Sequence, residues 1–314
     1  MSSPAGAKDA RRRRMTGFAC VLGATVLWSA IPVCVKFAVS AFDAYTITWM
    51  RFAGSCLILL VIARGLGVYT PLRRGDLRLA LVAAAGIGWN YLCYLRGLED
   101  TTASAGNLVV QFEVVALVIL GRLWLKEYIG GARMVGMLVT FAGVGLVVWS
   151  GEDLSALVRS RYFFGNALIF AAAPLWAVYA VCQKLLAGRG VPVSSSLACV
   201  FGMAAVLTLP AMLLGFERRG PVTPEVAVSL AVLIVVSTAG SYTLMAKGLE
   251  YLEASTAGMI TCLLPVFTII AARIFLDEIV TAFVGVGAFL VVLGLLVIAR
   301  AEPRHPIGEP DAAR

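Results

Sequence analysis

Charged residues are scarce in this sequence, and histidine is almost absent from it. Only 14% of the 314 residues are charged, whereas a soluble domain carries about 25%. The one histidine, His305, lies in a polar C-terminal segment, which excludes a histidine-based metal site or proton relay among the apolar residues. The seven cysteines stand singly within apolar runs, a pattern that predicts small buried residues rather than disulfides or metal ligands. We therefore expect neither a metal nor a cofactor.

Several functional signatures are missing as well. The sequence has no Walker-type phosphate loop and no long polar segment that would form a soluble domain, so direct drive by ATP is excluded. The net charge of +8 does not indicate nucleic-acid binding, because most Lys and Arg residues stand in short loops. A membrane-embedded lipid-modifying enzyme would need clustered carboxylates or histidines, and a sensor or scaffold would need larger loops. The sequence offers neither feature, so both classes are weak candidates.

Apolar sequence is what the chain has in abundance. Hydrophobic residues make up 60% of it, and the mean hydropathy is +0.90. They recur in runs of about 20 residues without alternation, the length with which an α-helix crosses a bilayer and a pattern that excludes a β-barrel. The predicted fold class is an all-α polytopic membrane protein. We predict ten transmembrane helices, over residues 17–39, 45–64, 77–95, 102–124, 132–150, 164–187, 195–216, 227–247, 254–275 and 279–299.

The predicted domain order is two five-helix halves between polar segments. It consists of a disordered basic tail over 1–16, a first half over 17–150, a linker over 151–163, a second half over 164–300 and a disordered tail over 301–314. The basic run before the first helix resembles a signal peptide, but no small-residue cleavage site follows, which favours an uncleaved signal-anchor. On the side of the two termini stand 18 Lys and Arg residues, against 7 on the other. We therefore predict a multi-pass protein of the cell (inner) membrane with both termini cytoplasmic.

An internal repeat joins the two halves. Residues 96–127 and 247–278 match at an offset of 151, with Gly97-Leu98-Glu99 meeting Gly248-Leu249-Glu250 and Glu127 meeting Glu278. At an offset of 148, Leu27-Trp28 meets Leu175-Trp176. An odd number of helices in each half gives the second copy the opposite orientation. Such inverted repeats place a substrate site near the membrane midplane and permit alternating access.

At these residues the sequence resembles the EamA family of the drug/metabolite transporter superfamily, over residues 17–300. The matching pieces are Leu27-Trp28 with Lys36, then Arg51, then Gly97-Leu98 with Ala103-Ser104-Ala105, and the endings Leu125-x-Glu127 and Leu276-x-Glu278. The Glu-Pro pair that is usual in the fourth helix is split here, because Glu113 precedes Val114 whereas Leu264 precedes Pro265. The resemblance implies a cavity lined by helices 1, 3, 4, 6, 8 and 9, and export of amino acids or related metabolites rather than enzyme activity.

Glu113 is the first candidate for substrate binding. It lies in the middle of the predicted fourth helix, where a carboxylate costs at least ~2.5 kcal/mol. Its functional interpretations are a partner for a substrate ammonium group or a protonatable coupling group, and the alternative is a structural hydrogen bond. Asn107 and Gln111 are further candidates, but on an unbroken helix Gln111 would lie about 200° from Glu113. We therefore expect one of these two residues to bond another helix.

Aromatic and polar side chains provide the other binding candidates. Trp176, Tyr179 and Gln183 share one helix face, which can line a cavity for an apolar or aromatic substrate or can serve helix packing. Trp28 occupies the equivalent place in the first helix. The pairs Asn90-Tyr91 and Ser241-Tyr242 are equivalent in the repeat, and interhelical hydrogen bonding is their alternative role.

The remaining candidates are structural or gating residues. Arg51, just inside the second helix, can snorkel or pair. The resemblance implies a structural or gating ion pair for it, with direct contact to the substrate as the alternative. Lys36, near the outer end of the first helix, is expected to be an interfacial anchor. Pro32, Pro174 and Pro265 lie within apolar helices and are expected to kink them. The pairs Gly136/Gly143 and Gly287/Gly294 each lie seven residues apart, which permits close approach of helix backbones.

These features favour a secondary transporter whose partners are a small-molecule substrate and membrane lipid. An importer of another metabolite class is the alternative within the same superfamily. The sequence leaves open the substrate, the direction, coupling to protons and the formation of a homodimer.

Overall fold

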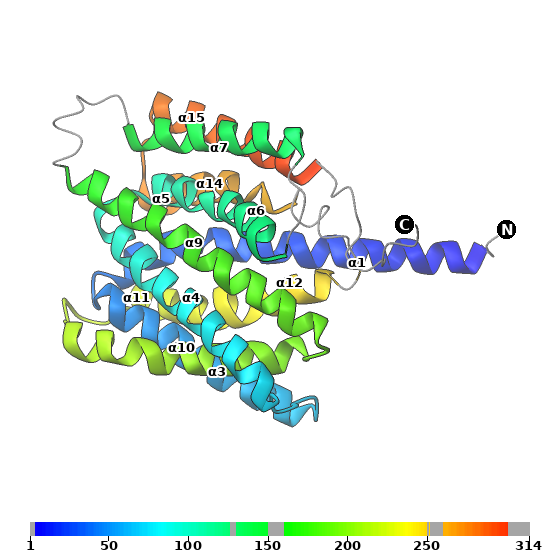
Figure 1. Cartoon of the computed structure of the whole chain (residues 1–314). Helices are drawn as coiled ribbons and strands as arrows, with labels where there is room; N and C mark the ends of the chain where they lie inside the picture. Colours follow the sequence, from blue (N-terminus) through cyan, green and yellow to red (C-terminus); the bar gives the residue numbers. More distant parts are fainter. Residues whose placement is uncertain (1–3, 126–129, 150–159, 250, 252–259, 301–314) are drawn as a thin grey trace.

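The computed structural model describes residues 4–125, 130–149, 160–249, 251 and 260–300, where the regular elements are helices (Figure 1). In the first half these are α1 (Pro4–Ser29), α2 (Ile31–Ala38), α3 (Ala44–Gly65), α4 (Arg74–Asp100), α5 (Ala103–Val110), α6 (Phe112–Leu125) and α7 (Gly131–Trp149). In the second half they are α9 (Arg161–Gly188), α10 (Val193–Gly215), α11 (Pro224–Ala231), η1 (Val232–Gly240), α12 (Ser241–Leu249), α14 (Leu264–Leu276) and α15 (Ala282–Arg300). The predicted all-α class is confirmed for these residues.

Seven helical segments in the described part of the chain are long and apolar enough to cross a membrane. They are Met15–Ala38, Ala44–Gly65, Ala103–Trp124, Gly131–Trp149, Arg161–Gly188, Val193–Gly215 and Pro224–Met245. Many large apolar side chains are exposed, such as Leu214 at 90% and Ile279 at 85%, as a surface in contact with lipid requires. The chain is therefore a multi-pass membrane protein, while the number of ten spans stays a prediction.

The N-terminal segment differs from its prediction. We expected a disordered tail over residues 1–16, but α1 already begins at Pro4 and projects beyond the bundle (Figure 1). Its first turns contain alanine, lysine and four consecutive arginines, which are strong helix formers and continue the membrane helix outward. The predicted C-terminal tail, 301–314, and most of the predicted linker, 151–163, lie outside the described residues.

Three of the predicted helices are interrupted. The first breaks at Ala30, and Pro32 then lies in the first turn of α2. The fourth breaks at Gln111, whose carbonyl accepts from Val114 N at 3.1 Å, a three-residue bond that marks a tightened turn. In the second half a turn at 262–263 precedes α14, with Pro265 in its first turn. The helix α9, by contrast, runs through Pro174 as one element.

The eighth predicted helix contains a π-helical segment. Between α11 and α12 the backbone adopts the wider π form over Val232–Gly240. Thr238 Oγ1 donates to the carbonyl of Leu233, five residues earlier, at 2.7 Å. Segments of this kind are rare and occur frequently at functional sites.

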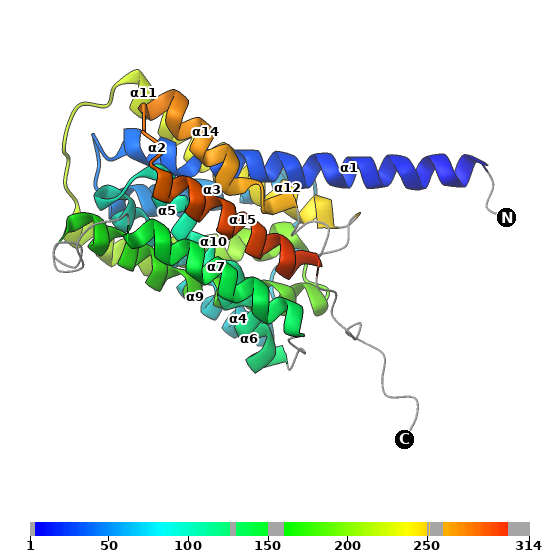
Figure 2. The same ribbon diagram turned by 90° about the horizontal axis from the view of Figure 1, so that it is seen from above.

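The glycine pairs fulfil their predicted packing role. The helices α7 and α15 lie side by side (Figures 1 and 2). A Cβ on Gly136 would stand 2.7 Å from the Gly294 carbonyl oxygen, and one on Gly143 would stand 2.9 Å from that of Gly287. These four positions therefore let the two backbones touch.

A second pair of glycine contacts is also formed by residues that are equivalent in the repeat. A Cβ on Gly97, in α4, would lie 2.6 Å from the Gly165 carbonyl oxygen of α9. A Cβ on Gly248, in α12, would lie 3.2 Å from the Gly17 carbonyl oxygen of α1. Gly248 is the repeat equivalent of Gly97, and Gly165 is that of Gly17. The contact of α4 with α9 thus recurs between α12 and α1.

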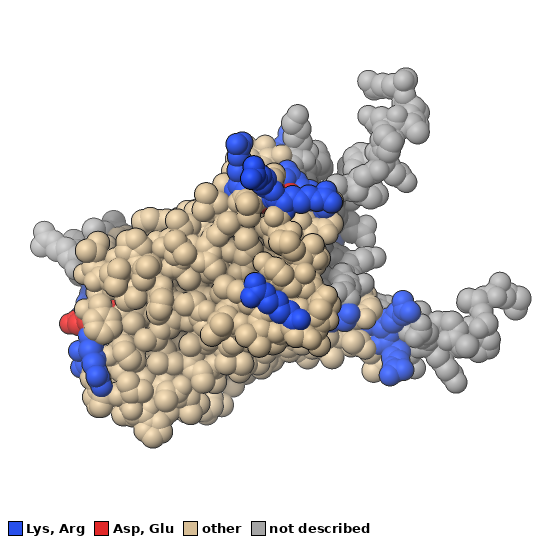
Figure 3. All heavy atoms as spheres, turned by 90° about the horizontal axis from the view of Figure 1, so that it is seen from below, with Lys and Arg blue, Asp and Glu red and all other residues tan. Residues whose placement is uncertain are grey.

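Charged residues mark the ends of the molecule. Lys and Arg side chains gather mainly toward its two ends, with a broad uncharged surface between them (Figure 3). The start of α1 and the end of α15 lie at the same end of the bundle (Figures 1 and 2). Such a distribution suits a bundle whose middle lies in hydrocarbon and whose ends reach water.

Candidate functional site

Arg51, from α3, is buried inside the bundle with only 1% of its surface exposed. Its Nε and Nη2 atoms donate to Thr238 Oγ1 at 3.2 and 3.0 Å, and its guanidinium lies 4.2 Å from the centroid of the Tyr91 ring. Nη1 is buried without a hydrogen-bond partner. The expected ion pair is not formed, since no carboxylate of the described residues lies within 4.0 Å of the guanidinium. A hydroxyl and an aromatic face compensate this charge only in part.

The π-helical segment η1 holds this arrangement together. Ser55, one turn after Arg51 on α3, donates to the Ile234 carbonyl of η1 at 2.8 Å. The absence of a side chain at Gly54 admits Ile234, because a Cβ there would stand 2.6 Å from its Cγ2. Thr238 was not among our candidates. Its signal in the sequence is the pair of adjacent hydroxyl residues that it forms with Ser237 inside an apolar run.

Aromatic side chains from six helices form a connected set that includes Tyr91, the ring beneath the guanidinium. Phe52 meets the rings of Tyr91 and Phe201 at 5.6 and 5.7 Å, and Tyr242 meets those of Trp28, Phe201 and Tyr179 at 5.3, 5.5 and 6.0 Å. The predicted candidates Trp28, Tyr91, Tyr179 and Tyr242 thus lie in one cluster, which we call the aromatic cluster together with Phe52 and Phe201. Edge-on contacts of this kind fix ring positions and present polarised faces and edges.

Asn90 joins Glu113 to α9. Its Nδ2 donates to Glu113 Oε1 at 3.2 Å and to the Ala172 carbonyl at 2.9 Å. Glu113 lies in the first turn of α6, where the helix dipole favours a negative charge. Tyr94, one turn after Asn90, is close enough to interact electrostatically with both Glu113 and Arg51.

The break at Gln111 changes the geometry that we assumed for the fourth helix. Because α5 ends there and α6 begins afresh, the angle calculated for an unbroken helix does not apply to Gln111 and Glu113. Gln111 Nε2 contacts the Asn107 carbonyl at 3.4 Å, within the same turn. Asn107 is buried, and its Oδ1 has no hydrogen-bond partner.

The predicted stripe on α9 is present, and part of it has polar partners. Trp176 and Tyr179 have ring centroids 6.4 Å apart. Gln183 Nε2 contacts the Tyr179 hydroxyl at 3.4 Å, and its Oε1 accepts from Ser196 Oγ of α10 at 3.0 Å. Ser241 is fully buried and donates to the Ser237 carbonyl of its own helix at 2.8 Å. Ser241 is thus set apart from the cluster, whereas its neighbour Tyr242 belongs to it.

One end of the bundle carries a network of charged groups that the sequence did not predict as a unit. Glu278, just after α14, accepts from the backbone N–H groups of Ala103 and Ser104 at 2.6 and 3.1 Å. Lys36 of α2 donates to the carbonyls of Leu98 and Thr101, so it is a structural clasp rather than the interfacial anchor that we expected. Glu278 thereby attaches the second half of the chain to the start of α5 in the first half.

The same end contains a second set of contacts. Arg219 pairs with Glu99 at 2.9 Å and with Glu217 at 2.9 Å. Arg96 pairs with Glu99 at 3.2 Å and with Asp100 at 2.7 Å, and Arg161 also pairs with Asp100. Together with the contacts of Glu278 and Lys36, these pairs form what we call the end network.

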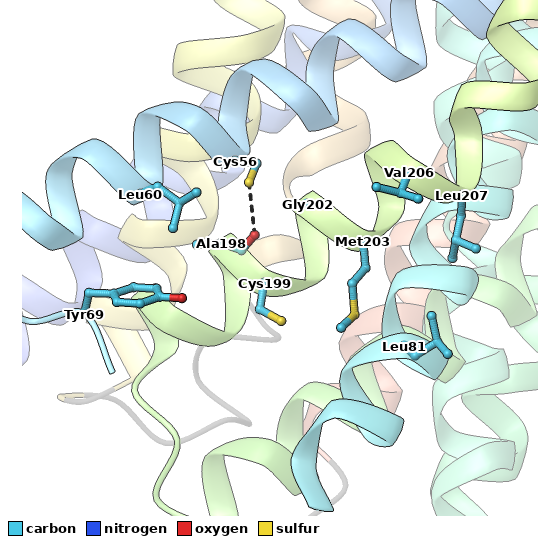
Figure 4. A pocket seen from close by; sticks show the side chains of 10 residues that line it. All are labelled: Cys56, Leu60, Tyr69, Leu81, Ala198, Cys199, Gly202, Met203, Val206 and Leu207. Carbon is cyan, nitrogen blue, oxygen red and sulfur yellow. Dashed lines mark hydrogen bonds between the residues drawn. The ribbon is translucent and has the colours of Figure 1, made fainter. Parts of the chain in front are cut away.

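A separate groove lies on the outer face of α3, α4 and α10. It has a volume of about 380 Å³, and none of our candidate residues lines it (Figure 4). Its lining is mostly apolar and consists of Cys56, Leu60, Tyr69, Leu81, Ala198, Cys199, Gly202, Met203, Val206 and Leu207. Val206 is 69% exposed, so the groove opens on the surface that faces lipid.

A bundle of apolar helices around a buried guanidinium, a carboxylate and an aromatic cluster defines a multi-pass membrane protein with a polar interior. The chain belongs to the EamA-like transporter family, whose sequence profile matches residues 15–149 and 163–300. The resemblance noted in the sequence is confirmed. Membership of this family makes the chain a transporter and not an enzyme.

Relatives from several organisms match nearly the whole chain. A protein of Haemophilus influenzae described as an uncharacterized transporter is 25% identical, over 92% of this chain and 96% of its own length. The uncharacterized inner membrane transporter YhbE of Escherichia coli is 24% identical, over 90% and 91%. A crystal structure with 18% identity has a TM-score of 0.65 over 91% of this chain and 97% of its own, which shows the shared fold.

Proposed function

We propose that this transporter is a secondary carrier that exports amino acids or related small metabolites across the inner membrane by alternating access. The observation that carries the proposal is the polar group inside an apolar bundle, in which the buried Asn90 holds the half-buried Glu113 and the buried Arg51 lies over Tyr91. Buried charge at membrane depth is costly and is retained where it serves a solute or an ion.

The glycine contacts support an inverted repeat of ten helices. Gly136 meets Gly294 as Gly287 meets Gly143, and Gly97 meets Gly165 as Gly248 meets Gly17. Exchanging the halves maps each contact onto its counterpart, which is the behaviour of a two-fold relation between them. The two matches of the family profile, one in each half, support the same proposal.

Interrupted helices and the end network support alternating access. The breaks at Ala30, at Gln111 and before Pro265 lie in helices that carry or border the polar group, so these positions can act as hinges. The end network joins the halves at one end by Glu278 and Arg219. We propose that this end is closed in the conformation described and opens when these contacts separate.

Within the site, Glu113 is the proposed partner of a substrate ammonium group, and Asn90 orients it. Asn107, with its unpartnered Oδ1, offers a second acceptor. The aromatic cluster and Trp176 provide the surface for an apolar or aromatic substrate side chain. Protonation of Glu113 would couple export to proton entry, and facilitated diffusion or import of another metabolite class are the alternatives.

Orientation follows from the positive-inside rule. The start of α1 and the end of α15 share one end of the bundle, and the sequence places 18 Lys and Arg residues on that side against 7 on the other. We propose that this end is cytoplasmic and that the end network faces outward.

The proposal is tested by efflux from cells or vesicles loaded with a panel of amino acids. We expect Glu113→Gln to lower the rate of efflux, or its pH dependence, while the protein still reaches the membrane. Glu225→Gln is the matched control, because Glu225 is an exposed carboxylate at the start of α11. Normal, equally pH-dependent efflux by Glu113→Gln would remove Glu113 from the mechanism. If the wild-type protein moves no member of the panel, the amino-acid assignment is wrong.

A further inference from the structure

Within the part of the chain that the structure describes, Arg51 is unusual because no carboxylate lies within 4.0 Å of its guanidinium. A guanidinium stays protonated at all physiological pH values, so burial cannot neutralise it as it can a lysine or a carboxyl group. In this chain it is 99% buried, and its fixed contacts are a threonine hydroxyl and a tyrosine face. The family repeat offers no equivalent arginine in the second half, so the charge has no structural role that both halves share.

The orientation of the guanidinium leaves one edge unused. Thr238 Oγ1 accepts hydrogen bonds from both Nε and Nη2, which fixes the plane of the guanidinium. Nη1 is left without a partner. Trp28 Nε1, within the aromatic cluster, is a second buried donor without a partner. An unpartnered cationic donor such as Arg51 Nη1 is suited to an oxygen of a carboxylate.

We infer that Arg51 binds the carboxylate of the substrate, with Thr238 as the residue that orients the guanidinium. The inference rests on the proposed function and names the ligand class more closely. Glu113 takes the ammonium group of the same molecule, and Tyr94 interacts electrostatically with both Glu113 and Arg51. The site therefore selects zwitterionic substrates over cationic amines of the same shape.

The first test compares different substrates on the wild-type protein. Purified wild-type protein in vesicles is assayed for competition and counterflow with phenylalanine, with phenethylamine and with phenylalanine amide, which share one ring. We expect phenylalanine to compete about tenfold or more better than either compound without a carboxylate. Equal competition by all three would overturn the inference and leave the carrier assignment standing.

Variants then assign the discrimination to Arg51. Arg51→Lys keeps the charge but loses the planar fork, and Arg51→Gln removes the charge. Both variants are expected to raise the KM for phenylalanine and to leave the KM for phenethylamine nearly unchanged. Thr238→Val is expected to raise the KM for phenylalanine by a smaller factor. Thermal unfolding in detergent identifies variants that fail to fold. If a variant fails, the comparison of the three substrates on the wild-type protein still tests the inference. An equal loss of transport for amino acid and amine by folded Arg51→Lys would show a structural role and contradict the inference.

The outcomes separate the two proposals. If the wild-type protein transports none of the three compounds, binding is measured by thermal stabilisation with the same compounds and with the other natural amino acids. Stabilisation by the carboxylate-bearing ligands alone supports the inference even where transport fails. Stabilisation by none of them, or by amines as much as by amino acids, overturns it.

Discussion

The contact of Glu278 with the start of α5 gives a prediction whose size follows from the structure. Its two carboxylate oxygens accept from Ala103 N and Ser104 N, at 2.6 and 3.1 Å, and these are two of the N–H groups that a helix start leaves without internal partners. The side chain reaches this position because Asp277 ends α14 in the left-handed conformation, with φ of 51°. Glu278 thus caps a helix of the other half of the chain.

Replacing Glu278 by alanine removes both acceptors and the charge near the helix dipole. The loss of a cap costs about 0.5–2 kcal/mol, and the loss of the charge at a helix N-terminus costs roughly 0.3–1 kcal/mol. We take about 1–2 kcal/mol for the combined effect on opening of this end, since the two terms overlap. An opening equilibrium changes by roughly 5–30-fold for that energy.

Hydrogen exchange detected by mass spectrometry measures this opening directly. We expect the amides of Ala103 and Ser104 to exchange about 5–30-fold faster in Glu278→Ala, with a smaller effect in Glu278→Gln, which keeps one acceptor. Peptides from the start of α3, which Asp43 caps, are the internal reference. Glu217→Gln is the matched variant, because that side chain lies in the same network but is 63% exposed. Unchanged exchange at these two amides, or the same acceleration throughout the chain, would refute the reasoning.

Further predictions concern packing and capping. Gly143→Ala is expected to lower the thermal stability of the detergent-solubilised protein by about 1–3 kcal/mol, because its Cβ would stand 2.9 Å from the Gly287 carbonyl oxygen; Gly145→Ala, with no atom within 4 Å, is the control and should unfold at the wild-type temperature. Asp43→Ala removes the acceptor of Thr46 N, Thr46 Oγ1 and Glu217 N. It should lower the stability measured in the same assay by about 0.5–2 kcal/mol. If Asp43→Ala and Asp43→Asn both unfold at the wild-type temperature, this reasoning fails. Asn90→Leu should lower efflux as Glu113→Gln does, and the double variant should lose little more, because Asn90 is predicted to act through Glu113; additive losses would show independent roles.

The sequence predicted the features that rest on periodicity and repetition. Runs of apolar residues located helices such as the one predicted over 132–150 and observed at Gly131–Trp149. The spacing of Gly136 and Gly143 predicted close backbone approach, which the structure confirms. These signals are local. They predict the helices reliably because lipid forces every backbone group to bond within its own helix.

Features that depend on two distant segments escaped prediction. The partner of Arg51 is Thr238, which lies 187 residues away, and no local pattern indicates that pairing. The break at Gln111 contains no proline or glycine, so the sequence favoured an unbroken helix across Gln111 and Glu113. Lys36 looked like an interfacial anchor because its acceptors, the carbonyls of Leu98 and Thr101, become available only where α4 ends.

Counterflow is the measurement that tests the central proposal most directly. Vesicles containing the purified protein are preloaded with an excess of unlabelled amino acid, and entry of the labelled amino acid is followed over time. A carrier that alternates its access exchanges one molecule for the other, so we predict transient accumulation of label above equilibrium in preloaded vesicles and none in empty ones. Label entry that rises linearly with concentration and ignores preloading would contradict the alternating-access carrier.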